Sequence, residues 1–168
     1  MTEQNHAYEQ AGSQLESIVE MVAALNVDYA RLETLENEMA DWNEDSTVQP
    51  WSLANPDDAA ELAELRAAAG DCENEEQARE AIQNDPLSVQ VRAGWHDPGT
   101  VDMTPEEFEI LLCTGGPAVR IMGELDHHLQ ASRAWIEYQD WGTPWTEYHG
   151  AHDTAALLTY CNCFFFGA

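Results

Sequence analysis

Apolar residues in the first quarter of the chain recur at alternating steps of three and four positions. The series runs through Tyr8, Ala11, Leu15, Ile18, Val22, Leu25, Tyr29 and Leu32, and after a one-residue slip through Leu35, Met39 and Trp42. This spacing is typical of a heptad seam on one face of a helix. No proline or glycine lies between Gly12 and Pro50. The pattern predicts one helix over about residues 7–43, roughly 55 Å long at 1.5 Å per residue.

Two shorter helices are predicted next, over about residues 57–69 and 75–83. The first begins with Pro56 at N1 and acids in its first turn, and Gly70 ends it. Its leucines could pack on the long helix as a helical hairpin, but it is too short to cover the whole seam. The uncovered part would be an apolar stripe in water, which predicts a homodimer through the long helix. Closure of the seam within one chain stays open as an alternative.

The pattern changes at Asp85-Pro86, where strand signals begin. Residues 87–92 alternate like a half-buried strand, and 118–125 and 133–140 are predicted to form an antiparallel hairpin. Thr104-Pro105-Glu106-Glu107 has a capping residue, Pro at N1 and two early acids, which predicts a helix ending at Gly115-Gly116.

A last helix is predicted from Ala155 to about Cys163. The fold class that follows is α+β. Its first part, residues 1–84, is a long acidic helical hairpin or coiled-coil segment. Its second part, residues 85–168, is a compact domain with a small antiparallel sheet and two helices.

The charge of the chain is strongly negative. Its 168 residues include 32 Asp and Glu but only six Arg and no Lys, for a formal net charge of -26. Nucleic acid and anionic membranes would repel such a protein. The first 85 residues hold 21 of the acids. Adaptation to high salt, the competing explanation, should affect both halves alike, so the asymmetry favours an interaction surface.

Neither a leader nor a membrane span is indicated by the apolar pattern. Without a secretory signal, the four cysteines are expected to be reduced thiols. We therefore expect a protein of the cytoplasm, with no membrane partner.

Motifs for metal binding or catalysis are weak. His149 and His152 followed by Cys161 and Cys163 contain zinc-ligand types, but two thiols at i and i+2 on a helix point to different faces. Buried cysteines packed beside the Phe164–Phe166 tail are the simpler interpretation. The chain has no Walker sequence, no Gly-x-Ser-x-Gly and no His-Glu-x-x-His. No metal, cofactor or catalytic residue is predicted, although an enzyme is not excluded.

The stretch QDWGTPWTEY, residues 139–148, gathers two tryptophans and two acids around a tight turn. One interpretation is a corner of the core in which the indoles pack together. The other is an exposed aromatic patch formed by Trp141 and Trp145 and rimmed by Asp140 and Glu147. Such a patch would suit an Arg-rich or Lys-rich surface through cation–π contacts and ion pairs.

Three segments carry a resemblance to a known group: GGPAVRI at 115–121, QDWGTPWTEY, and the closing Tyr160–Gly167. Together they resemble small acidic proteins from bacterial phages and mobile elements. The resemblance is limited to residues 85–168, and it carries over no active-site residue. It implies a setting in which genes often encode inhibitors of host defence or modifiers of host nucleic-acid enzymes.

The leading functional hypothesis is an acidic decoy. A helix with carboxylates at short intervals can imitate the phosphates that a basic nucleic-acid-binding protein tracks, such as a restriction or CRISPR-type nuclease of a bacterial host. The chain itself would not bind nucleic acid directly. The predicted contact residues are Glu16, Glu20, Asp28, Glu33, Glu36, Glu38, Asp41, Glu44 and Asp45, with the aromatic patch as a second contact.

The alternative is a small enzyme or ligand-binding domain over 85–168, with the acidic helices serving solubility and dimerisation. Its pocket would be aromatic, and a histidine or aspartate would transfer protons. The residues of this pocket would be Trp95, Trp135, Trp141, Trp145 and Tyr148, with His96, Asp140 or His149.

Overall fold

A computed structural model describes residues 5–45, 49–101 and 103–167. It confirms the α+β class, with six helices and five strands in the described part of the chain. The chain divides into two compact units. The helical unit is Val22–Arg79, and the sheet unit comprises the described residues up to Met21 and those from Glu80 onward. This division differs from the predicted 1–84 and 85–168.

The long helix predicted over residues 7–43 is wrong. The structure has α1 over His6–Leu25 and α2 over Tyr29–Asp45. The break lies at Asp28, whose Oδ1 accepts the Arg31 N–H at 3.0 Å as an N-cap does. The apolar series continues across this point, but the N-cap bond of Asp28 stabilises the start of a second helix at Tyr29. A continuous coiled-coil segment is therefore not confirmed.

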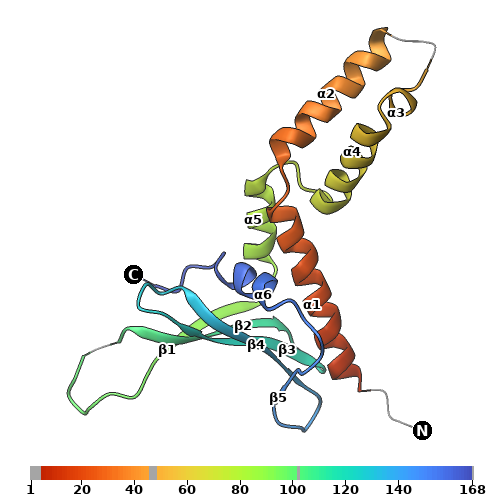
Figure 1. Cartoon of the computed structure of the whole chain (residues 1–168). Coiled ribbons are helices and arrows are strands. Elements are labelled where there is room, and N and C mark those ends of the chain that lie inside the picture. The colour runs from red at the N-terminus through yellow and green to blue at the C-terminus, as the bar shows by residue number, and fades with distance from the viewer. Residues whose placement is uncertain (1–4, 46–48, 102, 168) are drawn as a thin grey trace. The chain divides into compact units, whose positions relative to one another are not determined.

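The helical unit is built from α2, α3 (Trp51–Ala54) and α4 (Pro56–Ala69), and α5 (Glu75–Asn84) begins within it. The predicted helices 57–69 and 75–83 are confirmed. Figure 1 shows α2 and α4 side by side. Between them lies a small apolar core of Leu32, Leu35, Trp51, Leu62 and Ala69.

The sheet unit contains five antiparallel strands in the order β1-β2-β3-β4-β5 (Figure 1). Their bounds are β1 Ser88–Ala93, β2 Pro105–Cys113, β3 Ala118–Leu125, β4 Ala131–Gln139 and β5 Thr146–Glu147. The predicted strand at 87–92 and the β3–β4 hairpin are confirmed.

The helix predicted between Thr104 and Gly115 is wrong, because that segment forms β2. Phe108, Ile110 and Leu112 are buried and alternate with the partly buried Glu109 and Leu111. This period of two fits one buried and one open face of a sheet. Pairing with two neighbouring strands outweighs the helix-start signal at Pro105, which acts only locally.

One face of the sheet forms the core of the unit. Register partners place Phe108 opposite Gly123, and Ile110 opposite Ile121, which in turn faces Ile136. A side chain at Gly123 would collide with the Phe108 ring, so that ring packs directly over the glycine backbone.

The last helix, α6 (Thr154–Cys161), packs against β4. Asp153 caps it by accepting the Ala156 N–H at 3.0 Å. The fully buried Tyr160 donates its hydroxyl proton to Asp85 at 2.6 Å. Burial, together with this bond, raises the pKa of Tyr160 far above its usual range. The predicted helix at 155–163 is confirmed, whereas no second helix follows Asp85 in the described residues.

Helix α1 belongs with the sheet over its first sixteen residues. Tyr8 stacks on Tyr148 with ring centroids 4.6 Å apart and meets Tyr138 edge-on at 5.8 Å. The seam residues Ala7, Ala11, Leu15, Ile18 and Val22 are all buried within the chain. These five seam residues are therefore covered within one chain, whereas Tyr8 and Trp42, at the two ends of the predicted seam, are 39% and 36% exposed.

Candidate functional site

The nine predicted acidic contact residues lie on two helices and the turn between them. Glu16 and Glu20 are exposed on α1 in the sheet unit. Asp28 is the N-cap of α2. The other six lie on α2 itself: Glu33, Glu36, Glu38, Asp41, Glu44 and Asp45. The structure thus concentrates the predicted set on one helix of 17 residues.

Helix α2 has one apolar face and one acidic face. Leu32 and Leu35 are buried against the core of the helical unit. At 100° per residue, five acids project away from that face, and all five are exposed. We call this set the acidic face of α2: Glu33, Glu38, Asp41, Glu44 and Asp45.

The arginines of the helical unit are held by its own carboxylates. Arg31 donates two bonds to Glu61 at 2.8 and 3.0 Å and one to Asp58 at 3.1 Å, which ties α2 to α4. The hydrogen bond from Arg31 lowers the pKa of Glu61. Arg66 on α4 donates to Glu36 at 2.9 Å.

Arg79 similarly donates to Glu75 at 3.0 Å, one helical turn away. With three arginines against fifteen acids between Val22 and Arg79, most carboxylates of this unit face water without a cation beside them. A hollow of about 930 Å³ adjoins the acidic face, lined by Glu33, Glu36 and Glu73 among others.

The two tryptophans of the aromatic patch have different surroundings. Trp141 is 79% exposed, so it is no part of a core. It lies against Gly116, where any side chain would collide with the indole. Asp140, also exposed, accepts the Trp141 backbone N–H at 2.8 Å. Trp145 is partly buried, and its ring is covered by the Arg120 guanidinium at 4.1 Å. One face of Trp145 is therefore already occupied by a cation of the same chain.

The five aromatics predicted for a pocket are not brought into one cavity. Trp95 is fully exposed in the β1–β2 loop. Trp135 lies on β4, and Tyr148 stacks on Tyr8. His96 and His149 are exposed. The aromatic pocket as predicted is therefore not formed.

A site that the sequence analysis missed lies on the second face of the sheet, which we call the open face. None of its residues is buried. Register partners arrange them in three rows across the strands. The rows are Arg92, Glu107, Glu124 and Arg133; then Gln90, Glu109, Met122 and Trp135; then Ser88, Leu111, Arg120, Glu137 and Glu147.

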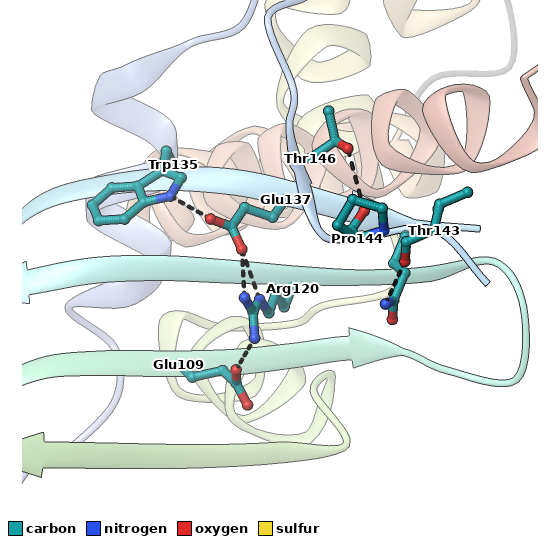
Figure 2. Close-up of polar contacts among 8 residues, drawn as sticks. Glu109, Arg120, Trp135, Glu137, Thr143, Pro144 and Thr146 are labelled. Carbon is teal, nitrogen blue, oxygen red and sulfur yellow. Dashed lines mark hydrogen bonds and ion pairs between the residues drawn. The ribbon is translucent and has the colours of Figure 1, made fainter. Parts of the chain in front are cut away.

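Arg120 is the centre of the third row. Its Nε and Nη2 donate to Glu137 Oε2 at 2.8 and 2.7 Å, and its Nη1 donates to Glu109 Oε2 at 2.6 Å. Trp135 Nε1 donates to the other oxygen of Glu137 at 3.1 Å. Figure 2 shows this chain of contacts running from Trp135 through Glu137 and Arg120 to Glu109. Charge-assisted bonds of this kind hold each of these side chains in one orientation.

The first row holds two further ion pairs, Arg92 with Glu107 and Arg133 with Glu124. The bond from Arg92 lowers the pKa of Glu107. All three arginines after Asp85 thus lie on this one face. The strand alternation of 118–125 indicated that Arg120 points away from the face of Val119 and Ile121, and the hairpin of β3 with β4 was predicted. The sequence analysis missed the site because it assigned residues 105–113, which supply Glu107 and Glu109, to a helix.

The residues considered for zinc are separated by burial. Cys161 and Cys163 are buried, whereas His149 and His152 are exposed. Desolvation raises the pKa of the Cys161 thiol, which disfavours the thiolate that a metal needs. No group of three or more potential metal ligands is formed among the described residues.

Comparison of the chain with protein-family models, curated proteins and solved structures finds no match. Among the described residues, no helix has both the length and the apolar character needed to cross a membrane.

Proposed function

We propose that the protein is an acidic inhibitor, a nucleic-acid mimic that binds a basic nucleic-acid-binding protein. The observation that carries the proposal is the acidic face of α2. Its carboxylates are exposed, while the arginines of the same unit are engaged by other acids. A surface of this kind attracts a cationic partner over a Debye length of about 8 Å at physiological salt.

The charge spacing on α2 is compatible with mimicry. From Glu33 to Asp45 the helix rises about 18 Å and carries five exposed carboxylates, or about one per 4.5 Å. One strand of DNA carries a phosphate about every 3.4 Å along the axis. The mimic would be the 17-residue α2, roughly 25 Å long, and not the 55 Å rod expected from the sequence.

The resemblance to proteins of phages and mobile elements suggests the identity of the partner. The proposed partner is a defence nuclease of restriction or CRISPR type, and the two proteins would bind in the cytoplasm of a bacterial host. The homodimer through the first helix stays a prediction. Five seam residues of α1 are buried within the chain, which removes part of the reason for expecting this dimer. Light scattering tests the prediction, and a monomeric mass would contradict it.

The test is a pull-down from nuclease-treated bacterial lysate with a rising salt gradient, on three full-length proteins. The first is wild type. The second neutralises the acidic face of α2 by Glu33→Gln, Glu38→Gln, Asp41→Asn and Glu44→Gln. The third is a control of equal charge change in the sheet unit, with Glu9→Gln, Glu80→Gln, Asp97→Asn and Glu106→Gln.

We expect wild type and control to retain a basic nucleic-acid-binding protein that salt elutes, and the α2 variant to lose it. Added wild-type protein should also release DNA from the captured partner, because both compete for one surface. Equal retention by the α2 variant and the control, or undisturbed DNA binding, would refute the proposal.

A ligand-binding domain remains the second candidate function, because the open face contains a cavity of about 440 Å³. That volume lies within the range of about 300–1,000 Å³ found for small-molecule pockets.

A further inference from the structure

The cavity of the open face has a defined floor and two defined walls. Glu109, Met122 and Trp135, neighbours in the middle row, form its floor. One wall is the pair Arg92–Glu107 and the other is the pair Arg120–Glu137. The cavity is therefore polar along its sides, and its base combines one carboxylate with a thioether and an indole.

The charges around this cavity favour a cation. Its lining contains three carboxylates and two guanidinium groups, and each guanidinium is already engaged by a glutamate. An anion would meet Glu107, Glu109 and Glu137 before any unengaged positive charge. A cation would find an acceptor at Glu109. Arg120 binds Oε2 of this carboxylate, and Oε1 accepts no hydrogen bond from the described part of the chain. The lining thus offers an acceptor oxygen but no unengaged cation.

The aromatic part of the lining favours a planar cation in particular. Trp135 is held in place by its hydrogen bond to Glu137. The same face already contains two guanidinium–indole contacts, Arg120 on Trp145 at 4.1 Å and Arg133 on Trp135 at 5.0 Å. In both, a glutamate pairs with the guanidinium. Guanidinium groups suit this combination because they stack on rings and bind carboxylates through a planar fork.

We propose that this cavity binds an arginine side chain of a basic polypeptide. The guanidinium donates to Glu109 Oε1 and lies over the face of Trp135 opposite the one that Arg133 covers, while the methylene stem packs on Met122. The volume of about 440 Å³ leaves room for backbone on either side of the arginine. This inference rests on the proposed function only for the nature of the partner, a basic protein. It adds a second contact, located on the sheet unit.

The test uses short peptides as probes and the full-length chain. The peptides are acetyl-Gly-Arg-Gly-amide, the same peptide with citrulline, which is neutral but of the same shape, and the same peptide with lysine. Binding is followed by NMR through the indole N–H signal of Trp135, assigned with Trp135→Phe. The arginine peptide should shift this signal with an affinity at least tenfold above that of the citrulline peptide, because only the charged guanidinium forms a charge-assisted bond to the carboxylate. The lysine peptide should bind more weakly than arginine, because an ammonium has no planar fork.

Glu109→Gln should weaken the arginine peptide about tenfold, while keeping a similar side-chain shape for Arg120. The matched control is Glu106→Gln, an exposed acid on the same strand that does not line the cavity. It should bind as wild type does. The dispersion of the core methyl signals verifies that each variant is folded. If Glu109→Gln binds the arginine peptide as tightly as wild type, or if citrulline binds equally well, the inference is overturned.

The α2 variant described above separates this inference from the proposed function. It should bind the arginine peptide as wild type does, because all of its substitutions lie in the helical unit and none of them lines the cavity. Loss of the lysate partner by the α2 variant, with no peptide binding to wild type, would support the proposed function and refute this site. The opposite pair of results would support the site alone.

Discussion

The helical unit and the sheet unit use acidic side chains in different ways. On the open face of the sheet, Glu107, Glu109, Glu124 and Glu137 each bind an arginine on a neighbouring strand. On the acidic face of α2, five acids project into water from a helix whose nearby arginines are bound elsewhere. The same residue types therefore strengthen tertiary structure in one unit and create an external field in the other. Cross-strand register brings opposite charges together, whereas the exposed face of a helix presents its charges to solvent.

The largest loss of stability should come from a substitution in the apolar core of the sheet unit, beneath the ion pairs of the open face. Phe108 is 1% exposed and stacks on Phe166 at 4.6 Å. Phe108→Ala should lower the free energy of unfolding by about 3–5 kcal/mol, through lost burial and a cavity. Urea denaturation followed by circular dichroism measures this. Phe165→Ala, at a residue 79% exposed, is the control and should change stability little.

The next largest effect is expected at Arg120, which pairs with two glutamates of the open face. Its side chain is 20% exposed and lies between Glu109 and Glu137. Arg120→Met should cost about 2–3 kcal/mol, because two partly buried carboxylates lose their shared cation. The matched control is Arg133→Met, whose side chain is 66% exposed and should cost less than about 1 kcal/mol. Equal losses for the two variants in urea denaturation would show that burial does not set the strength of these pairs.

In the helical unit, the break before α2 is the place to test. Asp28→Ala removes the side-chain acceptor for the Arg31 N–H. The expected loss is about 1 kcal/mol, with faster amide hydrogen exchange in the first turn of α2. Asp28→Asn, which keeps an acceptor oxygen, should retain most of the stability. If Asp28→Ala leaves exchange unchanged, α1 and α2 are separated by something other than this cap.

The smallest effect concerns pH. Arg92 lowers the pKa of Glu107 below its usual value of 4.5, so the ionised form is favoured in the folded state. A group of this kind contributes stability above the unfolded pKa, and the contribution is lost as pH falls through the folded value. Glu107→Gln should therefore be less stable than wild type at pH 7, by under about 1 kcal/mol, and the difference should shrink as the pH falls below 4.5. Glu106→Gln, at an exposed neighbour, is the control for the loss of one negative charge from the same strand.

Sequence reasoning succeeded where local signals and tertiary structure agreed. Pro56 with its following acids begins α4, and the alternation of 118–125 forms β3. It failed at β2, where Thr104-Pro105-Glu106-Glu107 has every sign of a helix start. The alternation of Phe108, Ile110 and Leu112 was the competing signal, and two neighbouring strands decided in its favour. The prediction of one long helix failed at Asp28. The apolar series continues through this residue, so the series gave no sign that Asp28 is the N-cap of a second helix.

The candidate sites divide in the same way. The acidic residues of α2 could be found from sequence, because a helix period and a count of charges place them on one exposed face. The ion pairs of Arg120 could not be found from sequence, because Glu109, Arg120 and Glu137 lie on three different strands. Only the pairing of strands decides which charge meets which.

The sequence by itself determined the α+β class, the excess of negative charge and most of the helices and strands, because these depend on composition and on short periodic patterns. The tertiary structure alone decided that five seam residues of the first helix are buried within the chain and that residues 105–113 pair as a strand. It also decided which carboxylates bind arginine and which face water. These outcomes depend on contacts between residues far apart in the chain, whose free energy no local pattern contains.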